Sequence, residues 1–399
     1  MRKKNGGALV SNILLMNAGS SSVKWKLFEL ETEKVVAKGL VERMLMPGSK
    51  FEIKYGEQKF QETYDNLTYE RACELIIEKI QEKGITSLEK IACVGHRVVA
   101  GGEKFRGATK IDAEKLEEII EMSDHAPLHN PMEAKYIELM QQVMPDTPQY
   151  AVFDSTFFTD MPEMNAIFSL PYELTQKYGI RRYGEHGISH GYISHRCAEL
   201  LEKPLEDLKL ITLHLGSGSS ISAVKDGKAY DSSMGFTPLT GVTMGTRCGD
   251  VDPSIVPFLM KKLDKSAEEI LQLFNSESGL LGISGKSPDM RDIRANIDDS
   301  RCALAREIFI NRIVKYVGSY YVEMGGADVL VFAGGIGEND PSLRRDVVSE
   351  LACLGISLDE ALNEKNAEGL ISTKDSKAKV MIVPTNEELA MVQAIKEKL

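Results

Sequence analysis

The chain has 399 residues, 43% of them hydrophobic and 27% charged, which is typical of a soluble globular protein with two or three domains. A net charge of −11 argues against bulk binding of nucleic acid, and no apolar run of about 18 residues predicts a transmembrane helix. Six cysteines without a C-x-x-C pair indicate reduced thiols in a cytoplasm and argue against a disulfide framework or a zinc site.

Three β-rich runs in the first part of the chain end in small or polar residues. They are ILLMNAG from residue 13, IACVGHRVV from residue 91 and YAVFDS from residue 150. Between the first two runs, residues 68–83 place Ala72, Leu75, Ile76 and Ile80 on one face, which predicts an amphipathic helix. The basic start of the chain leads through a broken apolar run into the first strand, so we expect no signal peptide.

The second part of the chain contains three further runs of this kind. They are LITLHLGSG from residue 210, VLVFAGG from residue 329 and VMIVPTN from residue 380. Residues 302–324 predict a helix with Leu304, Phe309 and Ile313 on its apolar face, and two glycines follow as a stop signal. Strands that alternate with helices predict an α/β protein, in which ligands gather beyond the carboxyl ends of the strands.

An approximate internal repeat links the two parts. ILLMNAGSSSVKWKLFE begins at residue 13 and ITLHLGSGSSISAVKDGK at residue 211, and each contains a strand, a Gly/Ser turn and a second strand. Shifting one segment by one residue against the other does not improve the match, so the register of the repeat is uncertain. Two unrelated hairpins would explain it, but we favour a duplication that gives two similar domains. We place their boundary near Asp154, giving domains 1–154 and 155–385, with the last helix (386–399) packing back on the first domain.

The stretch GLLGISGKSP, residues 279–288, looks like the phosphate loop of a nucleotide-binding protein. A Walker A loop needs a glycine, four residues, and then Gly-Lys-Ser/Thr. The required glycine falls at Leu280, and Gly279 is one residue too far away. We therefore expect Lys286 to be structural or solvent-facing.

Three small-residue turns offer backbone N–H groups to phosphates instead. They lie at residues 18–22, 216–220 and 334–337. Asn339 or Asp340 could cap a following helix that has Pro341 in its first turn. Each turn alone is weak evidence for a ligand, but three of them favour a two-lobed nucleotide site.

Charged residues follow several strands. Arg97 and Arg247 suit bidentate binding of carboxylate or phosphate, although a surface ion pair is the plainer reading of either one. Asp154 could face the metal of a nucleotide or cap a helix, and Glu387 could bind a metal or favour a helix N-terminus.

Three histidines, His186, His190 and His195, lie close together in the sequence. Gly187 and Gly191 argue against a long regular helix there, and no nearby cysteine completes a zinc site. We expect one histidine to contact substrate and the others to be structural.

Taken together, these residues resemble the acetokinase family, which holds the acetate and propionate kinases. The resemblance runs in order from residue 17 to residue 388, and its motifs are NAGSSSVK, GHRVVAGG, APLHNP, YGEHGISH, HLGSGSS, MGFTPLTGVTMGTRCGDVDP, SGLLGISGKSPDMRDI, VFAGGIGEN and PTNEE. It implies the duplicated α/β fold of actin-like ATPases and sugar kinases (ribonuclease H-like), with a cleft between two domains. It also implies a cytoplasmic homodimer that converts ATP and acetate to ADP and acetyl phosphate, reversibly and with Mg²⁺ or Mn²⁺.

The resemblance also implies roles for individual residues. Asn17 and Glu387 would place the metal, Arg97 and Arg247 would grip the acyl carboxylate and the phosphoryl group, Asp154 would be the catalytic acid and His186 would stabilise transition-state charge. Val99, Leu128 and Pro238 would wall the acyl pocket. The nucleotide would be held by Lys24, by the loop His214, Leu215, Gly216, Ser217 and Gly218, by Asp289, Met290 and Arg291, and by the loop Gly335, Ile336, Gly337, Glu338 and Asn339.

The chemistry modifies one of these roles. A carboxylate substrate, with a pKa of about 4, is already ionised near neutral pH and needs no base. We therefore expect Asp154 to orient metal-bound water or an arginine.

Three residues depart from the family pattern and leave acyl-chain preference open. They are Glu185 in place of Phe, Ser217 in place of Asn, and Phe158 in place of His. Propionate kinase, a sugar or glycerol kinase, and a non-catalytic ATP-binding regulator remain alternatives.

Overall fold

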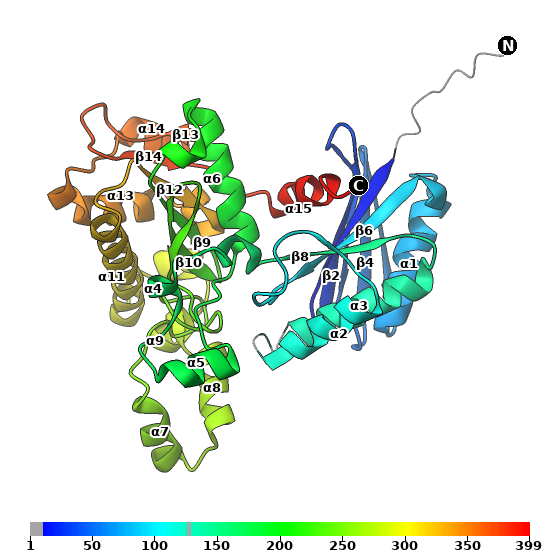
Figure 1. Ribbon diagram of the computed structural model, residues 1–399, viewed down its shortest axis with the longest axis horizontal. Helices are drawn as coiled ribbons and strands as arrows, with labels where there is room; N and C mark the ends of the chain where they lie inside the picture. Colours follow the sequence, from blue (N-terminus) through cyan, green and yellow to red (C-terminus); the bar gives the residue numbers. More distant parts are fainter. Residues whose placement is uncertain (1–10, 125, 127–128) are drawn as a thin grey trace. The chain divides into compact units, whose positions relative to one another are not determined.

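The computed structural model describes residues 11–124, 126 and 129–399. The chain divides into two compact units (Figure 1). The first unit contains Met1–Thr156 and Asn386–Leu399, and the second contains Phe157–Thr385. Leu128, predicted to wall the acyl pocket, lies outside the described residues.

The first unit is built on a mixed sheet with strand order β5-β4-β3-β2-β1-β6-β8-β7. Its strands are β1 (Asn12–Ala18), β2 (Ser22–Glu29), β3 (Val35–Glu42), β4 (Ser49–Tyr55), β5 (Gln58–Tyr64), β6 (Ile91–Val98), β7 (Thr109–Lys110) and β8 (Gln149–Phe153). Its helices are α1 (Tyr69–Glu82), α2 (Ala113–Glu121), α3 (Asn130–Val143) and α15 (Glu387–Lys396).

Helices cover both faces of this sheet. The predicted apolar face of α1 is confirmed, since Ala72, Leu75, Ile76 and Ile80 are all buried in a core shared with α3 and the sheet. Helix α15 packs closely on the opposite face, because Gly95 of β6 has no side chain. Ile395 of α15 fills the space that a side chain there would need.

The only tryptophan of the sequence, Trp25, lies in the hydrophobic core of the first unit. Along β2, buried Val23 and Trp25 point to one face and exposed Lys24 to the other. Trp25 is 1% exposed. A Cβ on Gly39, its partner on β3, would lie 2.4 Å from the indole ring, so this position needs glycine. The indole Nε1 is buried and makes no hydrogen bond with the described residues.

The second unit contains a sheet with strand order β11-β10-β9-β12-β14-β13. Its strands are β9 (Leu210–Leu215), β10 (Ser219–Lys225), β11 (Lys228–Ser232), β12 (Val329–Ala333), β13 (Gly369–Leu370) and β14 (Lys379–Ile382). Its helices are α4 (Glu163–Ala166), α5 (Tyr172–Tyr178), α6 (Gly187–Leu201), α7 (Ile255–Leu263), α8 (Ala267–Ser276), α9 (Gly279–Ser284), α10 (Met290–Ala295), α11 (Ser300–Glu323), α12 (Gly334–Asn339), α13 (Pro341–Glu350) and α14 (Glu360–Lys365).

Helices again lie on both faces of the sheet. Buried residues of α11 and α13 share one core with β9, β10 and β12, and those of α6 pack on the other face. The predicted helix at 302–324 is present as α11, but Leu304 is 47% exposed, so its assignment to the apolar face was wrong. The buried stripe instead begins at Cys302 and Ala305 and continues through Phe309, the residues that pack into the core of the second unit.

The two sheets share a core of five strands with the same order and directions. In β3-β2-β1-β6-β8 and in β11-β10-β9-β12-β14, the first two pairings are antiparallel and the last two are parallel. This confirms the duplicated α/β fold. Four residues separate the last paired residues Ala18 and Val23, whereas three separate Leu215 and Ser219. The turns therefore differ by one residue, which is why the sequence repeat has no unique register.

Candidate functional site

A cluster of charges lies where β6 and β8 end in the first unit. The Arg97 guanidinium binds Asp154 in bidentate fashion, with Nη2 2.8 Å and Nε 3.2 Å from Oδ2, and Nη1 lies 3.1 Å from Glu387 Oε2. Asp154 is only 2% exposed. Burial by itself would lower the pKa of the Arg97 guanidinium. The negative charges of Asp154 and Glu387 together outweigh that effect, so the pKa lies above the usual arginine value. The structure thus brings three predicted residues together, with the Arg97 guanidinium held between the carboxylates of Asp154 and Glu387.

The backbone that follows Arg97 is held by side chains that sequence reasoning missed. Three successive N–H groups each donate to a buried side chain: Val99 to Glu133 Oε2 at 2.9 Å, Ala100 to Asn130 Oδ1 at 3.0 Å, and Gly101 to Ser155 Oγ at 3.0 Å. Burial raises the pKa of Glu133 to about 8. These bonds fix the bend that carries Val99. Asn130 lies within the motif APLHNP, but neither it nor Glu133 or Ser155 was assigned a role from the sequence.

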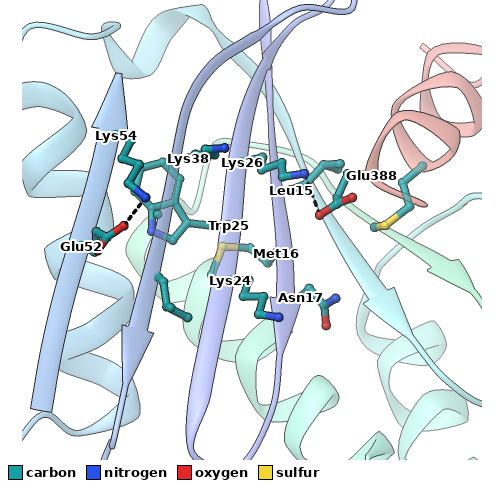
Figure 2. Close-up of a pocket in the computed structure, with 13 residues that line it drawn as sticks. Leu15, Met16, Asn17, Lys24, Trp25, Lys26, Lys38, Glu52, Lys54 and Glu388 are labelled. Atoms are coloured by element: carbon teal, nitrogen blue, oxygen red, sulfur yellow. Dashed lines mark ion pairs between the residues drawn. The ribbon is translucent and has the colours of Figure 1, made fainter. Parts of the chain in front are cut away.

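Asn17 and Lys24, predicted to place metal and phosphate, line a cavity of about 190 Å³ over β1–β4 and α15. Figure 2 shows Lys24 and Asn17 near each other at one end of this cavity, and the Lys26–Glu388 ion pair elsewhere along its wall. The Asn17 side chain makes no hydrogen bond with the described residues, and Glu388 is held by Lys26 at 2.9 Å. Of the two adjacent glutamates, only Glu387 faces Arg97.

In the second unit, His186 and Arg247 converge at Gly218. A Cβ on Gly218 would lie 3.2 Å from His186 Cε1 and Nε2 and 3.7 Å from Arg247 Nη1. His186 stacks on His214 with ring centroids 4.4 Å apart. Because the His186 imidazole and the Arg247 guanidinium meet at a residue without a side chain, the point suits a small anion.

Arg247 is itself largely buried. Burial lowers the pKa of its guanidinium, and the negative charge of Glu185 opposes this effect. Arg247 Nη1 lies 3.4 Å from the carbonyl oxygen of Pro238, so these two predicted residues are neighbours. Glu185 is 5% exposed and acts electrostatically on the arginine that would grip the substrate.

The histidine segment forms a regular helix, which corrects the prediction. Gly187 begins α6, which continues to Leu201. Gly191 lies against the ring of Phe157, where a Cβ would come within 3.3 Å, so this packing explains the glycine without a break in the helix. Among the described residues, no group of three or more His, Cys, Asp or Glu side chains is placed to hold a metal.

Three of the predicted nucleotide segments line one cavity of about 410 Å³ in the second unit. Its predicted members are Gly216, Ser217, Asp289, Met290, Arg291, Gly335, Ile336 and Asn339, and its unpredicted members are Pro288, Arg294 and Asp340. Arg294 lies on α10 and forms an ion pair with Asp340 at 3.1 Å. Asp340 also caps α13, so of the two caps that the sequence allowed, Asn339 and Asp340, the second is the one used.

The remaining predicted nucleotide residues lie elsewhere. Lys24 belongs to the first unit, and Gly218 faces His186. His214 and Leu215 belong to strand β9, not to a loop, because both pair with β10. Residues 335–339 were also expected in a loop, but they form helix α12, in which the Glu338 carboxylate accepts the Gly334 N–H at 2.9 Å.

The Walker-like stretch serves packing. Residues 279–284 form α9, and Gly285 ends it with a left-handed φ of 67°. Lys286 forms an exposed ion pair with Asp299 at 3.0 Å, in line with the prediction. A Cβ on Gly279 would lie 2.2 Å from the carbonyl oxygen of Met244. The glycines therefore permit close backbone contacts and a helix end.

Comparison with known proteins gives full-length matches. The model of the acetokinase family matches residues 12–393. The chain is 50% identical over 390 residues to acetate kinase 1 of Latilactobacillus sakei, covering 97% of this chain and 99% of that protein. It is 48% identical to acetate kinase of Limosilactobacillus fermentum, with 97% and 98% covered.

Solved structures give matches of the same extent. A propionate kinase from Francisella tularensis has a TM-score of 0.92 and 43% identity, covering 96% of this chain and 98% of its own. The Porphyromonas gingivalis acetate kinase has a TM-score of 0.90 and 41% identity, with 97% and 99% covered. In the described part of the chain, no helix is long and apolar enough to cross a membrane.

Proposed function

This chain belongs to the acetokinase family and is a phosphotransferase with acetate kinase activity, and we propose that it transfers the γ-phosphoryl group of ATP directly and reversibly to acetate. The products are ADP and acetyl phosphate. The observation that carries the assignment is the identity of 50% over nearly the whole length of both proteins.

The nucleotide is assigned to the second unit. The cavity of about 410 Å³ has the size of a small-molecule site, and it combines glycine backbones with Asp289 and Arg291. Nothing lies within 4 Å of the position that a Cβ on Gly335 would take, so a phosphate could approach the backbone closely there.

The acyl carboxylate is assigned to Arg97. Its five N–H donors are not exhausted by Asp154 and Glu387, so N–H groups remain for a substrate oxygen. Since acetate is ionised near neutral pH, Asp154 has no proton to remove from it. Asp154 acts instead by holding the Arg97 guanidinium in one orientation. The hydrogen bonds from Arg97 Nε and Nη2 to Asp154 support this positioning role.

His186 and Arg247 are assigned to the phosphoryl group in transfer. The transition state spreads negative charge over the equatorial oxygens, and preorganised donors lower its energy most effectively where water is excluded. The convergence of the two side chains at Gly218 provides such donors.

Asn17 and Glu387 fit Mg²⁺ by their chemistry. Mg²⁺ prefers oxygen ligands and is commonly held by one or two protein groups together with substrate phosphates. The amide of Asn17 is not engaged by described residues, and the described residues offer no all-protein cage of His, Cys, Asp or Glu. When bound, Mg²⁺ would neutralise phosphate charge.

Propionate is a second candidate acceptor. A propionate kinase matches this chain with a TM-score of 0.92, and Glu185 replaces the family phenylalanine expected at the acyl pocket. A sugar or glycerol kinase needs a base for its hydroxyl substrate. The bidentate pair of Asp154 with Arg97 supports the carboxylate acceptor over that alternative.

The test is a hydroxamate assay with Mg-ATP and acetate, propionate, butyrate or glycerol. We expect hydroxamate from acetate and propionate, with kcat/KM falling for butyrate. ATP turnover that depends on glycerol and not on acetate would overturn the proposal. We also infer a cytoplasmic homodimer, which light scattering after gel filtration checks for oligomeric state.

A further inference from the structure

A chain of short hydrogen bonds runs through the buried interior of the second unit and ends at His186. Thr212 Oγ1 lies 2.7 Å from His190 Nδ1, and His190 Nε2 lies 2.7 Å from Ser220 Oγ. Ser220 Oγ in turn lies 2.9 Å from His186 Nδ1. Thr212, His190 and Ser220 are each 0% exposed, so water does not compete for these bonds.

The direction of this chain follows from counting protons. Thr212 also contacts the carbonyl oxygen of Ser222 at 3.3 Å, and a carbonyl only accepts. If Thr212 donates its single proton there, it accepts from His190 Nδ1–H. A neutral His190 then accepts at Nε2 from the Ser220 hydroxyl, and Ser220 accepts from His186 Nδ1–H. The opposite direction would forfeit the bond to Ser222.

His190 meets the condition of neutrality. Complete burial lowers its pKa well below the usual histidine range, and His214 adds to this effect. The ring of Phe158 packs edge-on against His190 with centroids 5.9 Å apart. A neutral imidazole between two hydroxyls transmits one direction of hydrogen bonding, because it has one donor and one acceptor.

We propose that Thr212, His190 and Ser220 are positioning residues that keep a proton on His186 Nδ1, so that Nε2 gains and releases the second proton facing Gly218. This deepens the proposed function, on which the role of His186 rests. The hydrogen bond made by one imidazole nitrogen sets the protonation of the other. Because Ser220 accepts from Nδ1–H in both states, His186 becomes a cation that donates from Nε2 without any rearrangement of the chain.

Other titratable and charged groups act on His186 as well. Arg247 lies on the far side of Gly218, His214 stacks on the imidazole ring, and Glu185 precedes it in the sequence. These groups remain in place when Thr212 is changed, because Thr212 contacts none of them in the hydrogen bonds described. Substitution at Thr212 therefore tests the chain and not the local field.

The matched variants are Thr212→Val and Thr212→Ser. Valine keeps the shape but removes the acceptor for His190 Nδ1–H, so His190 should switch to the Nε2–H tautomer and donate to Ser220. Ser220 would then donate to His186 Nδ1. We expect ¹⁵N-edited NMR, with His186→Asn to identify the signal, to show neutral His186 protonated on Nδ1 in the native chain and in Thr212→Ser, but on Nε2 in Thr212→Val.

Kinetics provide a second readout. Loss of the partner that orients a metal-bound histidine typically costs about 10–100-fold in activity, and by analogy kcat of Thr212→Val should fall by that factor while KM for ATP stays within about twofold. The pH at which His186 gains its second proton should fall too, and Thr212→Ser should restore both properties. Ser220→Ala, which removes the last link, serves if the valine variant does not fold.

Native neutral His186 protonated on Nε2 would overturn the proposal, as would an unchanged tautomer in Thr212→Val. The NMR result does not depend on turnover. If no acyl phosphate forms but His186 carries its proton on Nδ1, the proposed reaction fails and the hydrogen-bond chain stands.

Discussion

Replacing Gly218 by alanine should abolish most catalysis without unfolding the protein. Gly218 is not among the glycines with positive φ, so alanine meets no backbone strain there. Its methyl carbon would lie 3.2 Å from His186 Nε2 and 3.7 Å from Arg247 Nη1. A phosphoryl oxygen needs to lie about 2.7–3.1 Å from its donors, so the methyl group would occupy its place.

The expected magnitude follows from the donors that are blocked. Removal of one preorganised donor typically costs about 10²–10³ in kcat, and the methyl group stands between two of them. The imidazole must also shift by a few tenths of an ångström, since ordinary contacts between such atoms begin near 3.5 Å. We therefore expect kcat to fall by about 10³. ATP affinity should change little, because the 410 Å³ cavity does not include Gly218.

The assay measures kcat from ADP release, ATP binding by calorimetry and Tm in parallel. Gly318→Ala is the matched control, because Gly318 lies on α11 and a Cβ there meets nothing within 4 Å. A Gly218→Ala protein with native Tm and a kcat within about threefold of the native value would refute the convergence of His186 and Arg247 on the transferred group.

Four other substitutions test separate parts of the protein. Arg247→Ala should lower kcat by about 10³. Lys286→Ala should change kcat by less than about threefold, because the ion pair of Lys286 with Asp299 is exposed. A larger loss of kcat in Lys286→Ala than in Arg247→Ala would indicate that the Walker-like stretch binds the phosphates. Asp154→Asn should raise KM for acetate and lower kcat by up to about 10²-fold, because Arg97 loses the carboxylate that holds its orientation, and an unchanged KM would argue against this role. Burial raises the pKa of Glu133 from a reference value of 4.5 to about 8 in the folded chain. Between these pH values the folded chain keeps a proton that the unfolded chain loses. The free energy of unfolding should therefore fall by at most about 5 kcal/mol as pH rises from 4.5 to 8. Glu133→Gln should remove that loss, and a Tm difference between the two proteins that does not grow over this pH range would contradict it.

Local patterns were sufficient for much of the fold. The alternation in β2, the apolar face of α1 and the two hairpins follow from side-chain period and turn residues within a few positions. The cap of α13 by Asp340 is equally local. Such features are decided by neighbours in the sequence, so a single sequence contains them.

Long-range contacts explain what was missed. Asn130 reaches Ala100 across 30 residues, and Ser155 reaches Gly101 across 54, so neither partner can be identified from its sequence neighbours. Gly191 was read as a helix breaker, although its role is contact with Phe157. These assignments depend on which elements the tertiary fold brings together. The motifs identified the segments of the cavity, and the fold added Arg294, which lies one residue beyond the motif that ends at Ile293.

The single tryptophan makes the two units spectroscopically unequal. Trp25 is fully enclosed in the first unit, and the second unit has no tryptophan. Its fluorescence on denaturation therefore follows the first unit alone, while circular dichroism sums both units. Two denaturation curves that coincide would show that the units unfold as one cooperative body, and curves that separate would give the free energy of unfolding of each duplicated half within the intact chain.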